Sequence, residues 1–302
     1  FTAENLGPLF LAFLSSLIVG YVGEVYGWHY GFGLAGIGMA LGLIQYVLGQ
    51  KHLKHVGNFL GTSENEEEKA ASKRPLSKIE KDRVVVLFIS FLLVIVFWGA
   101  FEQAGGLMNI YASEKTNRML MGWEVPASWF QSLNAMFIII FGTVVAAYWA
   151  KRKLNGKLST SLFKMILGLI IMGAGFFFMT GASMQYDDGG SSAMYWLVLA
   201  YLFHTIGELC LSPVALSYIT KLSPVKYGSI MMGVYFAMTG FGNKLAGLLG
   251  ESASELGEYT IFTGIAVFCV LFGLLVMVFR NKLEKLTHGA EDNERIINTQ
   301  TE

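Results

Sequence analysis

Two acidic residues, Glu102 and Glu208, stand inside long apolar runs of this 302-residue chain. Glu102 lies in the stretch FWGAFEQAGG and Glu208 in FHTIGELCLSPV. A carboxylate near the centre of a lipid bilayer costs about 2.5–3.5 kcal/mol on insertion scales, whereas an apolar side chain there costs nothing. An acid at such a place therefore indicates a function, and the chemistry open to it is carrying a proton or binding a cation.

Glu102 has polar and small neighbours at helical spacing. If the segment is one helix, Trp98, Glu102, Gly105, Gly106 and Asn109 lie along one side of it. An acid, an amide, an aromatic ring and two glycines suit the lining of a water-filled cavity, where a carboxyl group can exchange its proton. The alternative is a structural carboxylate that pairs with a group on a neighbouring helix.

Glu208 belongs to a second polar stripe, in which His204, Glu208 and Ser212 follow one another at four-residue intervals. Pro213 removes a backbone donor, so a kink or unwinding is expected near Leu209. A membrane acid beside a helix break is a candidate for holding an ammonium group. The alternatives are a packing kink with an incidental acid and, for His204, an ordinary buried histidine.

Amides and a tyrosine on two further apolar segments could complete such a cavity. Gln131 and Asn134 share a helix face, where they could bind a polar ligand or join neighbouring helices by hydrogen bonds. Tyr235 begins another four-residue repeat, which Thr239 and Asn243 continue. Small residues around that repeat favour tight helix packing. Lys244 nearby could reach the membrane surface or pair with an acid, and the sequence does not decide between these roles.

The elements that must position these residues are membrane-spanning helices. The chain is 54% hydrophobic and 15% charged, with a mean hydropathy of +0.51, so lipid is its expected solvent. The two cysteines, Cys210 and Cys269, lie in apolar runs and are expected to be buried free thiols. Runs of mostly apolar residues predict an all-α membrane protein with spans near 6–23, 30–49, 84–112, 126–150, 162–184, 192–222, 228–250 and 259–281.

Basic residues predict the orientation of these spans. If the 50–83 loop is cytoplasmic, 19 of the 22 Lys and Arg residues fall on that side and two on the other. Both ends of the chain are then cytoplasmic. We expect residues 1–50 to be the last two helices of an N-terminal bundle, 51–83 a cytoplasmic linker, 84–281 a C-terminal six-helix bundle and 282–302 a cytoplasmic tail.

No motif for other chemistry was found in the sequence. It has no phosphate-binding loop, no metal-ligand cluster and no nucleophile paired with a base, and nothing indicates nucleic-acid binding. A membrane enzyme using Glu102 and Glu208 as acid and base is one alternative, although the two acids lie on separate helices. Composition and spacing favour secondary transport of a polar solute with protons.

Five segments together resemble the proton-dependent oligopeptide transporter (POT) family. GYVGEVYGWHYGFGLAGIGM (20–39), with NLG before it, is similar to that family's fifth and sixth helices. The other four segments are FWGAFEQAGGLMNIYA (97–112), SWFQSLNAMFI (128–138), GELCLSPVALSYITKLSP (207–224) and MMGVYFAMTGFGNKLAG (231–247). The resemblance covers nearly the whole chain except the linker and tail. It implies the major facilitator fold, of which this chain holds helices five to twelve.

The resemblance also implies a function and roles for six residues. It implies import of di- and tripeptides across the bacterial inner membrane, driven by protons as the coupling ion and with no cofactor. Glu102 matches the family's proton-coupling acid, and Glu208 the acid that binds the peptide amino terminus. The other matches are substrate-binding positions: Asn5, Asn134, Tyr235, where the family often has tryptophan, and, less closely, Ser212.

Some features of the family are absent or altered. The basic residues that the family uses at the peptide carboxylate belong to earlier helices, so this chain alone is not expected to transport. Ala135 stands where the family commonly has proline, and Val214 and Ala215 replace a glycine-containing step. The 50–83 segment is too polar for the two extra helices of many bacterial members. A transporter of another small polar solute and a peptide receptor without transport remain alternatives.

Overall fold

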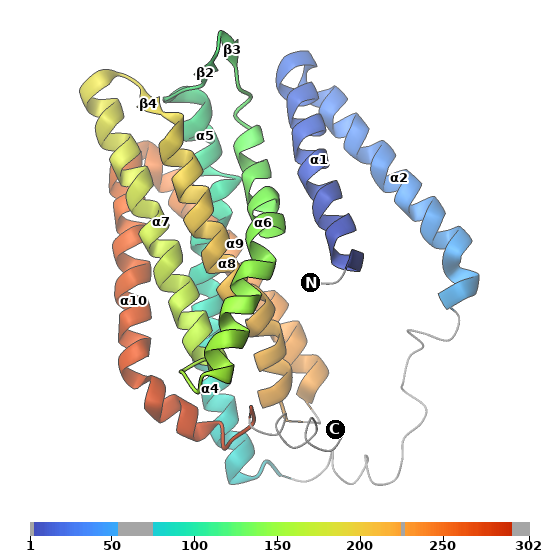
Figure 1. The fold of residues 1–302 in the computed structure, drawn as a ribbon, viewed down its shortest axis with the longest axis vertical. Coiled ribbons are helices and arrows are strands. Elements are labelled where there is room, and N and C mark those ends of the chain that lie inside the picture. Colours follow the sequence, from blue (N-terminus) through green and yellow to red (C-terminus); the bar gives the residue numbers. More distant parts are fainter. Residues whose placement is uncertain (1–2, 54–74, 225–226, 292–302) are drawn as a thin grey trace.

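The computed structural model describes residues 3–53, 75–224 and 227–291 (Figure 1). Within these ranges, the side chains of residues 3–6, 8, 9 and 53 are not described. The predicted site residue Asn5 lies in the first helix, but its side chain is therefore outside the described part of the chain. Most of the linker and of the tail is also outside it.

Helices make up nearly all of the described structure. Seven of the eight predicted spans each coincide with one helix, although several boundaries differ by a few residues, and the span 84–112 is divided among α4, η1 and α5. The helices are α1 (Ala3–Tyr26), α2 (Trp28–Leu53), α4 (Lys78–Phe101), the 3-10 helix η1 (Glu102–Ala104), α5 (Leu107–Glu114), α6 (Trp129–Leu154), α7 (Ser161–Gly189), α8 (Met194–Leu222), α9 (Gly228–Leu256) and α10 (Glu258–Leu286).

Four two-residue strands lie at one end of the bundle. They are β1 (Thr116–Asn117), β2 (Met119–Leu120), β3 (Trp123–Glu124) and β4 (Ser192–Ala193). Strand β1 pairs in parallel with β4, and β2 pairs with β3 as a hairpin. The β1–β4 pair ties the loop after α5 to the start of α8, at the upper end of the bundle in Figure 1.

Helix α4 begins in the polar stretch before the predicted span. The Ser77 side chain accepts the Glu80 backbone N–H, and the Glu80 carboxylate accepts the Ser77 backbone N–H. This reciprocal capping box satisfies two backbone donors that a helix start leaves open. The helix therefore starts at Lys78 rather than near residue 84.

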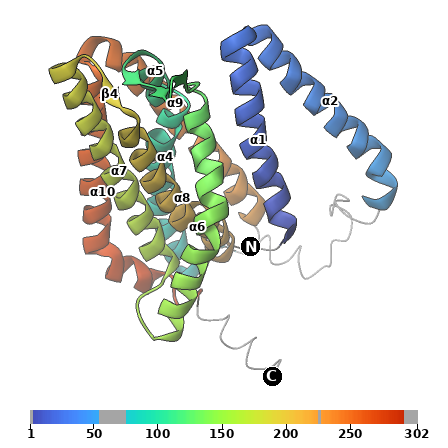
Figure 2. The ribbon, with the colours of Figure 1, turned by 45° about the horizontal axis from the view of Figure 1, so that its top comes forward.

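The bundle formed by α4 to α10 has one continuous apolar core. Helix α7 packs against α8 and α10, and α4 against α9 (Figures 1 and 2). Two glycine pairs allow backbones to approach closely, Gly168 with Gly207 between α7 and α8, and Gly99 with Gly242 between α4 and α9. Tight packing in α9 thus occurs at Gly242. Small residues at membrane helix interfaces have this role generally.

Helices α1 and α2 stand beside this bundle. They pack on each other, and α1 also packs on α6, whereas most large apolar side chains of α2 are exposed (Figures 1 and 2). At the strand end, both carboxylate oxygens of Glu24 accept backbone N–H groups before α6, from Ala127 at 2.9 Å and Ser128 at 2.7 Å. The Trp129 indole also donates to the Leu17 carbonyl at 3.1 Å.

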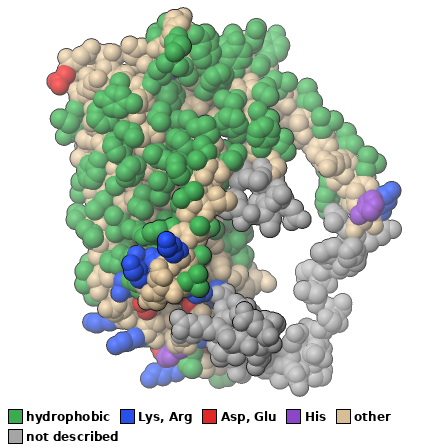
Figure 3. All heavy atoms as spheres, viewed as in Figure 1, with side chains coloured by type: hydrophobic (Ala, Val, Ile, Leu, Met, Phe, Trp, Pro, Cys, Tyr) green, Lys and Arg blue, Asp and Glu red, His purple; other side chains and the backbone are tan. Residues whose placement is uncertain are grey.

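The surface of the molecule fits a membrane. Apolar side chains cover the flanks of the helices, and the visible Lys and Arg side chains gather at the end that carries the loop between α6 and α7 (Figure 3). Six described helical segments are long and apolar enough to span a membrane: 28–52, 78–114, 129–154, 161–189, 194–222 and 258–286. The apolar part of α1, Phe10–Tyr26, is shorter, and α9 does not meet the same criterion.

Candidate transport site

Glu102 lies where the long third span is interrupted. Helix α4 ends at Phe101, residues Glu102–Ala104 form a single 3-10 turn, and a new helix, α5, starts at Leu107 after two glycines. The expected continuous face from Trp98 to Asn109 is therefore wrong, because helical spacing does not carry across this break. Glu102 is partly buried, and its carboxylate makes no hydrogen bond or ion pair within the described part of the chain.

Two buried side chains satisfy the backbone around the break. The Gln103 amide donates to the carbonyl of Gly99 at 3.3 Å and to that of Ala246 on α9 at 3.0 Å. The Tyr201 hydroxyl on α8 donates to the carbonyl of Ala104 at 2.9 Å. Irregular backbone at membrane depth is tolerated where neighbouring protein groups take up its polar atoms. Gln103 thus stabilises the helix break, whereas the carboxylate of its neighbour Glu102 has no fixed partner among the described residues and can bind a proton.

Glu208 and Asn134 meet across two helices. The Asn134 amide on α6 donates to the Glu208 carboxylate at 2.8 Å and to the Thr205 hydroxyl at 3.2 Å. Thr205 in turn donates to the Tyr201 carbonyl at 2.7 Å. Thr205 is fully buried, and by accepting one N–H of the Asn134 amide it helps to orient the amide so that it also donates to Glu208. Thr205 was not predicted from the sequence, although it lies in the same segment as Glu208.

A cavity of about 360 Å³ lies beside Glu208, between α6, α8 and α9. Glu208, Ser212 and Tyr235 all line it, so three of the predicted substrate-binding residues share one cavity. Glu208 is the charged residue among its described lining residues, and the rest of the wall is largely apolar. Glu102 lies close enough to Glu208 for the two negative charges to interact.

The structure also places residues whose roles were left open. Neither ring nitrogen of His204 has a hydrogen-bond partner within the described residues, and the ring lies against Phe176 with 4.4 Å between centroids. His204 is thus a core residue one turn from Glu208, while Lys244 is exposed on α9. Of the kink or unwinding expected near Leu209, the unwinding is wrong, because α8 continues through Pro213 from Met194 to Leu222.

This geometry can bind a small cationic group and exchange protons. Glu208, oriented by Asn134, offers a carboxylate to a positive group in the cavity, and Glu102 offers a second carboxylate without a fixed partner. Among the described residues no cluster of three His, Cys, Asp or Glu could hold a metal ion. Such acids inside a helical bundle characterise solute carriers of the membrane.

Comparison with known proteins identifies the kind of carrier. The model of the POT family matches residues 2–66 and 69–261, and the chain belongs to this family. The resemblance noted in the sequence is therefore confirmed. A mutant of the peptide transporter POT in complex with alafosfalin has a similar structure, with a TM-score of 0.82 and 27% identity, over 93% of this chain and 67% of that one. The chain thus has part of the major facilitator fold, corresponding to 67% of that transporter's chain.

Two curated relatives are also peptide transporters. The peptide transporter YePEPT of Yersinia enterocolitica is 33% identical over 72% of this chain and 44% of its own length. A di-/tripeptide transporter of Lactococcus lactis subsp. cremoris is 25% identical over 93% of this chain and 67% of its own length. The chain thus spans only 44% and 67% of the lengths of these two relatives. They are transporters rather than enzymes, which argues against the enzyme alternative.

Proposed function

We propose that the protein containing this chain is a proton-coupled symporter that imports di- and tripeptides by alternating access. The pair formed by Glu208 and Asn134 at the wall of the cavity supports this proposal most directly. A peptide presents an ammonium group at one end, and a carboxylate with a fixed orientation binds it by a charge-assisted hydrogen bond. Ser212 and Tyr235 contact the first residue of the peptide from the same cavity.

Glu102 is the proton carrier in this proposal. Its carboxylate lies at the helix break, has no fixed partner among the described residues and repels Glu208 when both are charged. Protonation of Glu102 removes this repulsion and leaves Glu208 negative for the peptide ammonium. Proton binding at Glu102 and peptide binding at Glu208 are thereby coupled through the charges of the two carboxylates. Each ligand then changes the affinity of the other site by the same factor.

The contact between α1 and α6 supports alternating access. Glu24 of α1 accepts two backbone N–H groups just before α6. This contact lies at the end of the molecule opposite to the loop between α6 and α7, where the visible Lys and Arg side chains gather (Figure 3). If the basic end faces the cytoplasm of a bacterium, this contact closes the outer face of the inner membrane. Both ends of the chain then lie in the cytoplasm, and import proceeds from a state in which the Glu24 contact is open.

Transport by the full-length protein in liposomes tests the proposal. Labelled dialanine uptake under an inward proton gradient is compared for wild type, Glu102→Gln, Glu208→Gln and the control Glu255→Gln, whose acid is exposed on α9. We expect Glu102→Gln to lose gradient-driven uptake but keep peptide exchange, Glu208→Gln to lose both, and the control to keep both. If the wild type binds dialanine without taking it up, the protein is a receptor. If the wild type neither binds dialanine nor takes it up, the protein carries another polar solute.

A further inference from the structure

One face of helix α8 joins the surroundings of the two membrane acids, Glu102 and Glu208. Tyr201, Thr205 and Glu208 follow one another on this helix at intervals of four and three residues, so they lie on the same face. The exposed fractions of Tyr201 and Thr205 are 2% and 0%, which places both side chains in the core of the bundle. Because α8 is continuous through this region, the spacing of the three residues is fixed by the helix itself.

Tyr201 fastens the turn that carries Glu102 to α8. Its hydroxyl donates to the Ala104 carbonyl at 2.9 Å, and Ala104 is the last residue of the 3-10 turn that begins at Glu102. The Gln103 amide of the same turn donates to carbonyls of α4 and α9 instead. Within the described part of the chain, the Tyr201 hydroxyl therefore supplies the hydrogen bond that holds Glu102 near α8.

The Glu208 carboxylate is held at the same face of α8. Asn134 uses its amide nitrogen to donate to Glu208 at 2.8 Å and to the Thr205 hydroxyl at 3.2 Å. The Thr205 hydroxyl donates in turn to the backbone carbonyl of Tyr201 at 2.7 Å. The two polar groups of Tyr201 thus serve different acids, since its carbonyl supports Glu208 through Thr205 and its hydroxyl positions the turn of Glu102.

The separation of the two carboxylates determines how strongly their charges interact. Coulomb energy falls in inverse proportion to distance and grows where burial reduces screening by water. Glu102 and Glu208 lie close enough for their charges to interact. Like charges move apart when nothing holds them, so a bond that keeps the Glu102 turn against α8 also maintains the repulsion between the acids.

We propose that Tyr201 is a positioning residue, whose hydroxyl holds Glu102 beside Glu208 so that protonation of Glu102 controls peptide binding at Glu208. This inference rests on the proposed function, in which the two acids bind the proton and the peptide ammonium group. The Tyr201 hydroxyl contacts neither ligand. Without it, Glu102 moves away from Glu208, which then stays negative and binds an ammonium group whether or not Glu102 carries a proton.

A double-mutant cycle on the full-length protein tests this role, with dialanine affinity measured by titration calorimetry at one fixed pH. Glu102→Gln represents the protonated acid and should strengthen binding about tenfold, within the usual range for coupled sites. Tyr201→Phe keeps the ring and should by itself strengthen binding about threefold, because the charged Glu102 moves away. In the Glu102→Gln background, Tyr201→Phe should leave the affinity unchanged, since no charge remains to be positioned. A damaged fold would instead weaken binding in both backgrounds.

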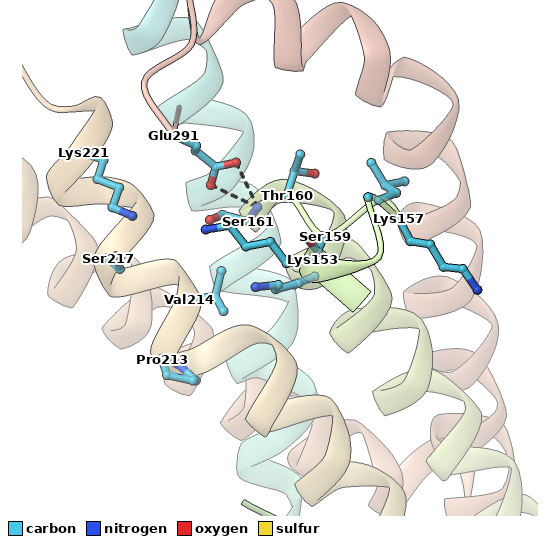
Figure 4. A pocket seen from close by; sticks show the side chains of 13 residues that line it. Lys153, Lys157, Ser159, Thr160, Ser161, Pro213, Val214, Ser217, Lys221 and Glu291 are labelled. Atoms are coloured by element: carbon cyan, nitrogen blue, oxygen red, sulfur yellow. Dashed lines mark hydrogen bonds between the residues drawn. The ribbon is translucent and has the colours of Figure 1, made fainter. Parts of the chain in front are cut away.

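Tyr218→Phe is the matched control for the loss of a buried hydroxyl from α8. Tyr218 is 1% exposed, and its hydroxyl has no hydrogen-bond partner among the described residues. In the sequence it lies between Ser217 and Lys221, which line another cavity at the basic end of the bundle (Figure 4). Tyr218→Phe should change neither the affinity for dialanine nor the effect of Glu102→Gln on it.

The cycle separates a failure of this inference from a failure of the proposed function. If Glu102→Gln strengthens binding by the same factor in the wild type and in Tyr201→Phe, the positioning role is overturned and the proposed function stands. If Glu102→Gln leaves the affinity of the otherwise wild-type protein unchanged, or if dialanine does not bind, the proposed function is wrong and the positioning role is overturned with it.

Discussion

The close approach of α7 and α8 at Gly168 and Gly207 makes a sharp prediction about the candidate transport site. A Cβ atom added to Gly207 would lie 2.7 Å from the Gly168 carbonyl oxygen and 3.2 Å from the Met172 backbone nitrogen. Ordinary contact begins at 3.4 Å, so Gly207→Ala requires the helices to separate by about 0.7 Å. Both nearest atoms are backbone, which cannot move aside as a side chain can.

The energetic effect follows from two opposing terms. Overpacking of this size costs about 1–3 kcal/mol, while alanine itself is better than glycine in a helix by about 0.8–1.0 kcal/mol. A matched control removes the second term: an added Cβ at Gly264 on α10 meets no described atom within 4 Å. The difference in stability between Gly207→Ala and Gly264→Ala is therefore the overpacking cost alone, about 2 kcal/mol.

Thermal unfolding of the purified full-length protein measures this difference. A loss of 2 kcal/mol in a bundle of about 200 residues lowers the unfolding midpoint by roughly 4–8 °C, so Gly207→Ala should unfold that much earlier than Gly264→Ala. Because Gly207 precedes Glu208, the same shift should lengthen the 2.8 Å bond to Asn134 and weaken peptide binding. Equal unfolding midpoints for the two variants would refute the reasoning from helix contact.

Three further perturbations test other contacts. Tyr201→Phe leaves the Ala104 carbonyl without its partner and should destabilise the protein by about 1 kcal/mol, seen as a lower unfolding midpoint than in Tyr195→Phe, whose ring is exposed. Glu24→Gln should weaken the contact of α1 with α6, so spin labels at Tyr26 and Met121 should move apart; an unchanged distance would contradict a closing role. Burial lowers the pKa of Lys115, but its hydrogen bond with Glu258 and that residue's charge raise it above the usual value overall. The ion pair should thus stabilise the protein by about 0.2–1 kcal/mol at neutral pH and lose this effect above pH 10.5, and Glu258→Gln should abolish that alkaline dependence.

The sequence predicted the positions of the helices and of the membrane acids better than it predicted the side-chain contacts between the helices. Apolar runs of about 20 residues locate spans because lipid excludes unpaired backbone groups, and this constraint needs no knowledge of neighbours. Glu208 and Asn134, to which the family resemblance gives a shared role, are in contact, while their role at the amino end of a peptide stays a prediction. Thr205 and Tyr201 were missed because their roles depend on atoms of α6 and η1, far away in the sequence.

The position of the helix break shows the limit of local reasoning most clearly. Pro213 marks a break by its own chemistry, yet α8 continues through it, whereas the glycine pair after Glu102 was expected to continue a helix and instead ends one. Missing backbone bonds are tolerated in a membrane wherever neighbouring groups replace them. At the α4 break, Gln103 donates to the Gly99 carbonyl and Tyr201 to the Ala104 carbonyl. The break, and with it the accessible carboxylate of Glu102, is therefore a property of the assembled bundle rather than of its local sequence.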